Sequence, residues 1–184
     1  MTNKGKRVIS VFGSSRPRPG EPEYVLAHDL GGALAHAGFT VCNGGYGGIM
    51  EASARGAKLA GSQTIGVITS AFPGNNANQW IDTVITAESL VDRLLKLVSI
   101  GDAYVILKGG TGTLLEFAAV WEFMNKNMIG EKPVVVIGSF WDDVVRTLKD
   151  ELAWEGLEDC TRYVTVVGSP RECVQVLQQR LEEG

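Results

Sequence analysis

Short apolar runs, rich in β-branched residues, alternate along the chain with longer segments whose apolar residues recur at helical spacing. The first pattern is typical of buried strands and the second of amphipathic helices. Strands are predicted at 7–13, 39–44, 64–69, 82–87, 103–107, 133–138 and 163–168. Helices are predicted between them, near 22–37, 47–60, 88–100, 112–127, 141–153 and 169–182.

The predicted strands are nearly continuous apolar runs, as in "PVVVIG" at 133–138, which is expected when both faces of a sheet are covered. Strands that alternate with helices predict the α/β class. We expect a doubly wound, mainly parallel sheet of about seven strands with helices on both faces. No linker or repeat interrupts residues 1–184, so one domain is expected. The longest irregular segment, 70–80, is a polar loop suited to a lid or rim.

Composition mainly excludes classes of function. The net charge is −4 and no block of Lys and Arg stands out, which argues against a nucleic-acid-binding surface. Three cysteines without CxxC spacing (Cys42, Cys160 and Cys173) and two histidines (His28 and His36) argue against a disulfide framework or a metal site. No apolar run is long enough to span a membrane or serve as a signal peptide, so we expect a cytoplasmic protein.

Three glycine- or serine-rich turns follow predicted strands. They are "GSSRPRPG" at 13–20, "NGGYGGIME" at 43–51 and "KGGTGTLLE" at 108–116. Carboxyl ends of parallel strands meet at one edge of the sheet, where such folds bind ligands. Glycines before a helix let unpaired backbone N–H groups approach an anion. The predicted phosphate- or nucleotide-binding residues are Gly13, Ser14, Ser15, Gly44, Gly45, Lys108, Gly109, Gly110, Thr111, Gly112 and Thr113.

Each turn also has an interpretation without a ligand. Thr113 and Glu116 have the spacing of a capping box, which stabilises a helix start by itself. The glycines of "NGGYGG" would suit a tight connection with close packing, and the first turn would suit a proline-stiffened loop with solvated arginines. None of the turns matches the dinucleotide fingerprint, a P-loop or a nucleophile elbow.

The helix within 87–102 carries Arg93, which spacing alone places on a solvated face. The predicted buried stripe is Leu90, Val91, Leu94, Leu95, Leu97 and Val98. The predicted polar face is Ser89, Asp92, Arg93, Lys96 and Ser99. The helix at 112–127 is apolar almost all round, so we expect it to be buried on more than one side, in the core or in a two-fold dimer interface. Cys42 is expected to be a small buried hydrophobic residue.

"GGTGTLLE", with Arg93 23 residues before Glu116, resembles the LOG family of cytokinin-activating phosphoribohydrolases, formerly labelled lysine decarboxylases. The family hallmark is PGGxGTxxE with an arginine on the preceding helix. "NGGYGGIMEASARGAKLAG" is similar to the family's second glycine turn and helix, and the likeness covers roughly residues 7–140.

The resemblance implies a Rossmann-like homodimer without a metal or organic cofactor. It implies hydrolysis of the N-glycosidic bond of a nucleoside 5′-monophosphate, which releases free base and ribose 5-phosphate. It also implies that Arg93 and Glu116 are the catalytic pair. A carboxylate suits this reaction because it stabilises an oxocarbenium-like transition state and can activate water.

The sequence departs from the family pattern at two positions. Lys108 replaces the proline before the double glycine, and Leu94 replaces the lysine that commonly follows the arginine. Lys108 would either bind phosphate or be a solvated lysine. The base and the physiological substrate stay open. The alternative is a non-catalytic nucleotide- or molybdenum-cofactor-binding carrier with the same fold, although Glu116 favours an enzyme. Lysine decarboxylation needs a pyridoxal phosphate lysine, for which no motif is present.

Overall fold

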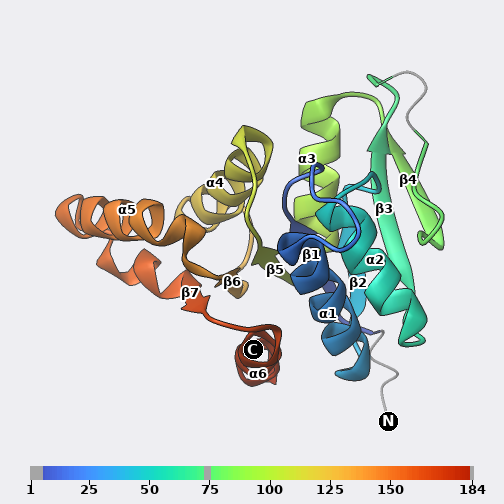
Figure 1. Ribbon diagram of the computed structural model, residues 1–184. Helices are drawn as coiled ribbons and strands as arrows, with labels where there is room; N and C mark the ends of the chain where they lie inside the picture. Colours follow the sequence, from blue (N-terminus) through green and yellow to red (C-terminus); the bar gives the residue numbers. More distant parts are fainter. Residues whose placement is uncertain (1–5, 73–75, 183–184) are drawn as a thin grey trace, which may run out of the picture.

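The computed structural model describes residues 6–72 and 76–182, which form a seven-stranded sheet with helices on both faces (Figure 1). The strands are β1 (Val8–Phe12), β2 (Thr40–Asn43), β3 (Thr64–Thr69), β4 (Thr83–Ala87), β5 (Ala103–Ile106), β6 (Val134–Ile137) and β7 (Val164–Val167). Their order is β4-β3-β2-β1-β5-β6-β7, and every neighbouring pair is parallel. The predicted α/β sheet is therefore confirmed, with all seven strands parallel.

The helices follow the strands as predicted. They are α1 (Pro22–His36), α2 (Ile49–Leu59), α3 (Leu90–Ile100), α4 (Thr111–Asn125), α5 (Asp142–Trp154) and α6 (Pro170–Glu182), with two 3₁₀ turns, η1 (Ser139–Trp141) and η2 (Glu158–Tyr163). Side chains of α1, α2 and α6 pack on one face of the sheet, and those of α3, α4 and α5 pack on the other. Within the described residues, no helix combines the length and apolar character needed to cross a membrane.

The direction of strand addition reverses between β1 and β5. The chain adds β2, β3 and β4 on one side of β1, and then returns to add β5, β6 and β7 on its other side. The helix after β1 covers one face, whereas the helix after β5 covers the opposite face. The loops that leave these two strands therefore diverge, and such a divergence opens a ligand crevice at the carboxyl edge of the sheet.

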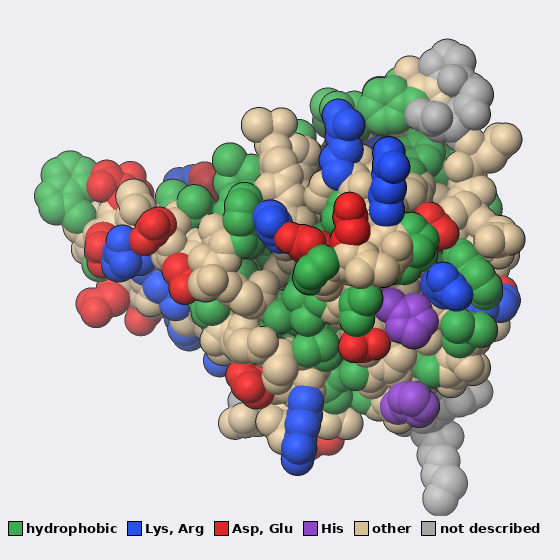
Figure 2. Space-filling model, viewed as in Figure 1, with side chains coloured by type: hydrophobic (Ala, Val, Ile, Leu, Met, Phe, Trp, Pro, Cys, Tyr) green, Lys and Arg blue, Asp and Glu red, His purple; other side chains and the backbone are tan. Residues whose placement is uncertain are grey.

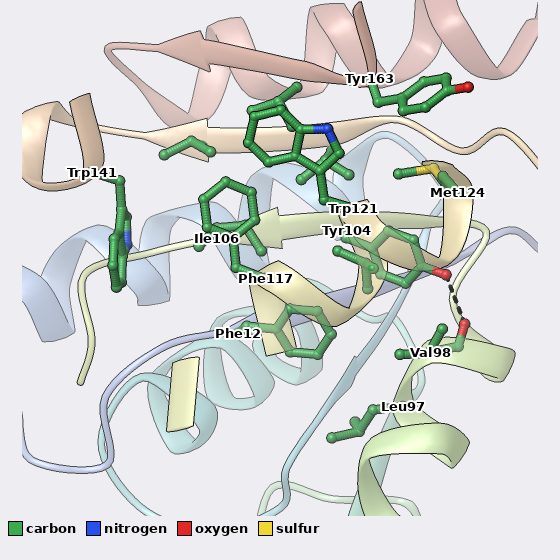
Figure 3. Packing of buried hydrophobic residues seen from close by; sticks show 14 of the residues in the cluster. Phe12, Leu97, Val98, Tyr104, Ile106, Phe117, Trp121, Met124, Trp141 and Tyr163 are labelled. Carbon is green, nitrogen blue, oxygen red and sulfur yellow. Dashed lines mark hydrogen bonds between the residues drawn. The ribbon is translucent and has the colours of Figure 1, made fainter. Parts of the chain in front are cut away.

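An aromatic cluster holds α4 against the sheet (Figure 3). The rings of Phe117 and Trp121 stack with centroids 5.6 Å apart, and Phe117 meets Trp141 edge-on at 6.2 Å. The hydroxyl of Tyr104 donates to the carbonyl of Val98 at 2.7 Å, which joins β5 to α3. Because large aromatic side chains contribute much of a core's burial energy, this packing holds α4 in place on the sheet.

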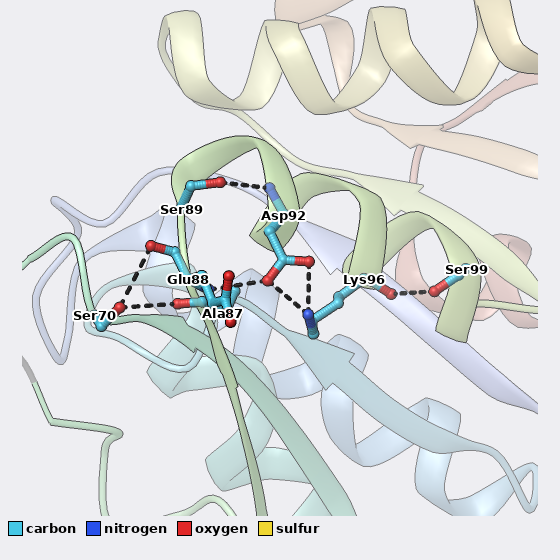
Figure 4. Close-up of polar contacts among 7 residues, drawn as sticks. All are labelled: Ser70, Ala87, Glu88, Ser89, Asp92, Lys96 and Ser99. Carbon is cyan, nitrogen blue, oxygen red and sulfur yellow. Dashed lines mark hydrogen bonds and ion pairs between the residues drawn. The ribbon is translucent and has the colours of Figure 1, made fainter.

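The N-terminus of α3 is fixed by its own polar residues (Figure 4). The hydroxyl oxygen of Ser89 accepts a hydrogen bond from the backbone N–H of Asp92 at 3.0 Å. The Asp92 carboxylate accepts from the N–H of Glu88 at 2.9 Å and pairs with Lys96 at 2.6 Å. The hydrogen bond from Lys96 is the main reason why the pKa of Asp92 lies below its ordinary value. These contacts set the position of Arg93 one residue further along.

The predicted buried face of α3 is confirmed for Leu97 and Val98 and wrong for Leu90, Val91, Leu95 and Arg93. Its buried residues are Arg93, Leu97 and Val98, whereas Leu90, Val91 and Leu95 are exposed. Helical spacing would put the leucines in the core, but tertiary contacts of the Arg93 side chain turn this face toward the sheet. Most apolar side chains of α4 are buried in the core, whereas Leu114 and Leu115 are exposed on the single chain, so the alternative of a dimer interface stays a prediction. Cys42 is fully buried, as predicted.

Candidate active site at the carboxyl edge of the sheet

The three glycine- and serine-rich turns meet at Ser14. Its backbone N–H donates to the carbonyl of Lys108 at 3.1 Å, and its own carbonyl accepts from the N–H of Ile49 at 2.9 Å. Gly48 has a φ of 66°, and a Cβ there would overlap the backbone of Ser14 and Ser15. The turn after β1 is thus in direct contact with those after β2 and β5, as the sequence predicts.

The turn after β5 leads into the N-terminus of α4 without a side-chain cap. The helix begins at Thr111, its N-cap is Gly110, and no side chain makes a capping hydrogen bond there. The capping-box interpretation of Thr113 and Glu116 is therefore wrong, because both residues lie inside the helix. Backbone N–H groups in the first turn of a helix have no partner within the helix and carry partial positive charge.

The glycines of this turn have different surroundings. A Cβ at Gly109 would overlap the side chain of Thr113, so close packing explains that glycine. A Cβ at Gly110 or Gly112 would meet no heavy atom within 4 Å. These two positions therefore leave the backbone around Thr111 open to a group outside the protein.

Arg93 is buried beneath the turns and is held by backbone carbonyls. Only 8% of the residue is exposed. Its Nε donates to the carbonyl of Val67 at 2.7 Å, and its Nη2 donates to that of Gly44 at 3.0 Å. The guanidinium carbon lies 5.3 Å from the ring centroid of Tyr46, a cation–π contact. The guanidinium thus joins the carboxyl ends of β2 and β3 in one fixed orientation.

Glu116 faces this guanidinium. Its Oε1 lies 3.9 Å from Nη1 of Arg93, and 15% of its side chain is exposed. Burial raises the pKa of Glu116 to about 7, and the positive charge of Arg93 opposes that rise. Desolvation penalises the charged form of a carboxyl group, whereas a nearby cation favours it. The sequence therefore places a carboxyl group of raised pKa beside the start of α4.

The glycines of the first two turns allow close packing and backbone conformations that position the site residues. A Cβ at Gly44 would overlap Nη2 of Arg93, so a side chain there would displace the guanidinium. Gly45 has a φ of 76°, and its N–H donates to Oδ1 of Asn43 at 2.9 Å. A Cβ at Gly13 would lie 2.7 Å from the side chain of Ile49. Packing and backbone conformation explain these three glycines.

Lys108 makes a contact that sequence reasoning missed. Its Nζ lies 2.6 Å from Oε1 of Glu23, in α1, so it is not an unpaired, solvated lysine, and a role in binding phosphate stays a prediction. Hydrogen bonding to Lys108 lowers the pKa of Glu23 below its ordinary value. The two residues are 85 positions apart. A charge of opposite sign in the adjacent α1 turn is the only signal in the sequence that could point to the pair.

Tyr46 and Asn78 are further residues around the site that were not predicted. The side-chain amide of Asn78 donates to the carbonyls of Gly45 at 3.1 Å and Tyr46 at 2.8 Å. Asn78 belongs to the segment 70–80, predicted as a lid or rim, of which residues 73–75 lie outside the described residues. The described part of the segment supports the turn that holds Arg93.

An all-parallel, doubly wound sheet with glycine turns at its switch point defines a Rossmann-like α/β protein. Residues 6–174 match the SLOG cluster4 family, and the chain belongs to this family. The match spans the sheet, the three turns and both members of the Arg93–Glu116 pair.

Relatives and solved structures agree with this assignment. The chain is 31% identical to the cytokinin riboside 5′-monophosphate phosphoribohydrolase of Mycobacterium marinum, over 83% of this chain and 82% of that protein. It is 30% identical to the protein of the same name from Mycobacterium tuberculosis, over 72% and 71% of the two chains. The resemblance to LOG proteins is therefore confirmed.

Among solved structures, the molybdenum cofactor binding protein of Rippkaea orientalis superposes with a TM-score of 0.73 at 27% identity, covering 97% of this chain and 99% of that one. The Moco carrier protein of Chlamydomonas reinhardtii gives a TM-score of 0.75 at 26% identity, covering 98% and 100%. The chain is thus similar in sequence to proteins named as enzymes, and in structure to proteins named as a cofactor-binding protein and a carrier.

Proposed function

We propose that this protein is a nucleoside 5′-monophosphate phosphoribohydrolase of the LOG type, with residues 1–184 acting as one nucleotide-binding domain. The observation that carries the proposal is the Arg93–Glu116 pair, 3.9 Å apart beside the uncapped start of α4. Two relatives named as phosphoribohydrolases, at 30% and 31% identity, support the same reaction. The reaction proceeds with water and needs no cofactor.

The substrate phosphate binds at the start of α4. The backbone N–H groups of Thr111, Gly112 and Thr113 supply donors and partial positive charge there. Ser14 and Ser15, from the turn after β1, add further donors from the facing side. Gly110 and Gly112 are open where a side chain would otherwise stand, which lets the phosphate reach the backbone.

Glu116 acts at the glycosidic carbon. The hydroxyl of a water molecule adds to C1′ as the bond from C1′ to the base nitrogen breaks, and that nitrogen receives a proton. The ionised carboxylate stabilises the positive charge that develops at C1′ and accepts a proton from the attacking water. Arg93 favours the ionised form of Glu116. Its two backbone contacts keep the guanidinium from moving with the substrate.

Base release should rise as pH increases through about 7. Burial raises the pKa of Glu116 to about 7, so the carboxylate form is scarce well below this value and predominates above it. Since the proposed reaction needs the carboxylate, the catalysed rate follows the ionised fraction. The profile is measured by chromatography of free base at saturating nucleotide between pH 5 and 9. A rate that falls through this interval would show instead that protonated Glu116 is the active form.

We also expect the chain to form a homodimer through the exposed apolar surface of α3 and α4. These helices pack side by side on one face of the sheet. The exposed apolar side chains are Leu90, Val91, Leu95, Leu114 and Leu115. Apolar patches of this kind on soluble proteins are commonly covered by partners, and two-fold self-association is the commonest arrangement.

Val91→Glu should convert the dimer to monomers. Val91 is 65% exposed, so a charge is tolerated in the separate chain but would be buried between two copies. Sedimentation velocity measures the change. Met128→Glu, at an equally exposed position beyond the end of α4, is the matched control and should leave the dimer intact. If wild-type protein already sediments as a monomer, the dimer is ruled out.

A carrier of a phosphate-bearing cofactor is the second candidate. It is favoured by the close superposition on a Moco carrier protein and a molybdenum cofactor binding protein over nearly the whole chain. The experiment that separates the two functions is incubation with AMP, other 5′-monophosphates and prenylated AMP, followed by chromatography of free base. Release of base from any of them supports the hydrolase. Tight nucleotide binding without release from any of them supports the carrier.

A further inference from the structure

A pocket adjoins the proposed phosphate site, and Arg93 is not among the residues that line it. Arg93 lies over the ends of β2 and β3, whereas this pocket lies between the turns after β1, β5 and β6. Its volume is about 360 Å³. Ser14 lines this pocket and also belongs to the proposed phosphate site, and Gly109, which lines it too, lies in the turn that leads to that site.

The pocket is lined by equal numbers of positively and negatively charged side chains. Two cations, Arg16 and Lys108, and two carboxylates, Glu21 and Glu23, line it. In Figure 2, Lys or Arg and Asp or Glu side chains are interspersed over the region where Figure 1 draws the loop that joins β1 to α1. A pocket built for a second phosphate would have an excess of positive charge. Carboxylates instead accept hydrogen bonds from hydroxyl groups, such as those of a sugar.

Phe140 forms an aromatic wall of the pocket, and its ring is held in place by Trp141. It is 51% exposed, and its ring packs edge-on against Trp141 with centroids 4.9 Å apart. The indole N–H of Trp141 donates to the carbonyl of Leu107 at 3.1 Å. The ring therefore keeps a set position, and Nζ of Lys108 lies over it, 5.8 Å from its centroid, in a cation–π contact. An exposed aromatic ring in a fixed position is suited to stacking against a sugar or a base.

The Lys108–Glu23 pair separates this pocket from a second one. The neighbouring pocket, of about 340 Å³, shares Glu23, Lys108 and Phe140 and has an apolar wall that includes Leu26 and Ile137. Each volume lies in the range of small-molecule sites. Together they offer more room than a single phosphate requires, which points to a ligand that continues beyond it.

We propose that this pocket binds a hydroxyl-bearing group, a sugar or a second nucleoside, joined to the 5′-phosphate of the nucleotide. The inference rests on the proposed function for the position of that phosphate. The substrate class is then a nucleotide extended at its phosphate. Phe140 stacks on the added group and Glu23 accepts a hydrogen bond from its hydroxyls, while Lys108 keeps Glu23 ionised.

Equilibrium binding of AMP, ADP and ADP-ribose to the full chain tests the proposal. Calorimetry on the Glu116→Gln variant measures binding without turnover. ADP-ribose should bind about tenfold more tightly than AMP, because it alone carries a group for the aromatic wall. ADP should bind within about threefold of AMP, because the pocket has no excess positive charge. Equal affinity for AMP and ADP-ribose overturns the proposal. Equal affinity for ADP and ADP-ribose overturns it as well, because the second phosphate would then account for the whole increase over AMP.

The Phe140→Ala variant tests whether the tighter binding of ADP-ribose depends on the aromatic ring. The ratio of the AMP dissociation constant to that of ADP-ribose should fall from about ten toward one. Trp154→Ala, which removes an exposed aromatic residue at the far end of α5, is the control and should keep the wild-type ratio. If the Phe140→Ala variant keeps the wild-type ratio of dissociation constants, Phe140 does not contact the added group and the proposal is overturned. Failure of the hydrolase proposal gives a different result, namely no free base from any nucleotide whatever the binding ratio.

Discussion

Glu116→Gln should lower the rate of base release by about 10²–10³-fold while nucleotide binding persists, because removing one preorganised electrostatic group from an active site typically has that effect. Glutamine keeps the size of the side chain but carries no charge to stabilise the cation at C1′, and it cannot accept a proton from water. Chromatography of free base gives the rate, and calorimetry with the same nucleotide gives the affinity.

Glu122→Gln is the matched control for this variant. Glu122 lies on the same helix, is exposed, and belongs to an i,i+4 pair with Lys126. It should retain wild-type activity because it lies away from the Arg93 guanidinium. If Glu116→Gln released base as fast as Glu122→Gln does, the carboxyl group would have no part in the chemistry.

Arg93→Met should lower both stability and activity. The free energy of unfolding should fall by about 2–6 kcal/mol, because the buried carbonyls of Val67 and Gly44 each lose a donor, and each unsatisfied buried group costs about 1–3 kcal/mol. Base release should fall as well, because the pKa of Glu116 would rise further without the opposing cation. Urea denaturation followed by circular dichroism measures the first effect.

Lys96→Met tests whether this loss is specific to the buried arginine. Lys96 lies on the same helix and pairs with Asp92 in a partly exposed contact, so its removal should cost less than about 1 kcal/mol. Equal unfolding free energies for the two variants would mean that the carbonyl contacts of Arg93 do not hold the ends of β2 and β3.

The order of strands and helices could be predicted from sequence because each strand is a short, nearly continuous apolar run with a turn after it. Parallel pairing then followed from the alternation, and the shared edge brought the three turns together. Arg93 and Glu116 could be paired only through the resemblance to LOG proteins, since helical spacing put Arg93 on the solvated side. Its burial depends on carbonyls at Gly44 and Val67, which no local pattern reveals.

Other features depended on contacts between distant segments. The start of α4 was predicted near residue 112, or with Thr113 as the cap in the capping-box interpretation, whereas the helix begins at Thr111 after Gly110. The contact of Lys108 with Glu23 joins two loops that the sequence separates widely. The exposed leucines of α3 have the same spacing as buried ones, so only the position of the helix on the sheet distinguishes them.

The guanidinium of Arg93 also donates hydrogen bonds to the carbonyls of Val67 and Gly44. Stability of the fold therefore requires arginine at position 93, whereas it does not require glutamate at position 116. Relatives that lack the proposed hydrolysis would be expected to differ at position 116 while keeping arginine at position 93. An arginine at position 93 is therefore weak evidence that a family member is an enzyme. The residue at position 116 distinguishes enzymes from binding proteins better.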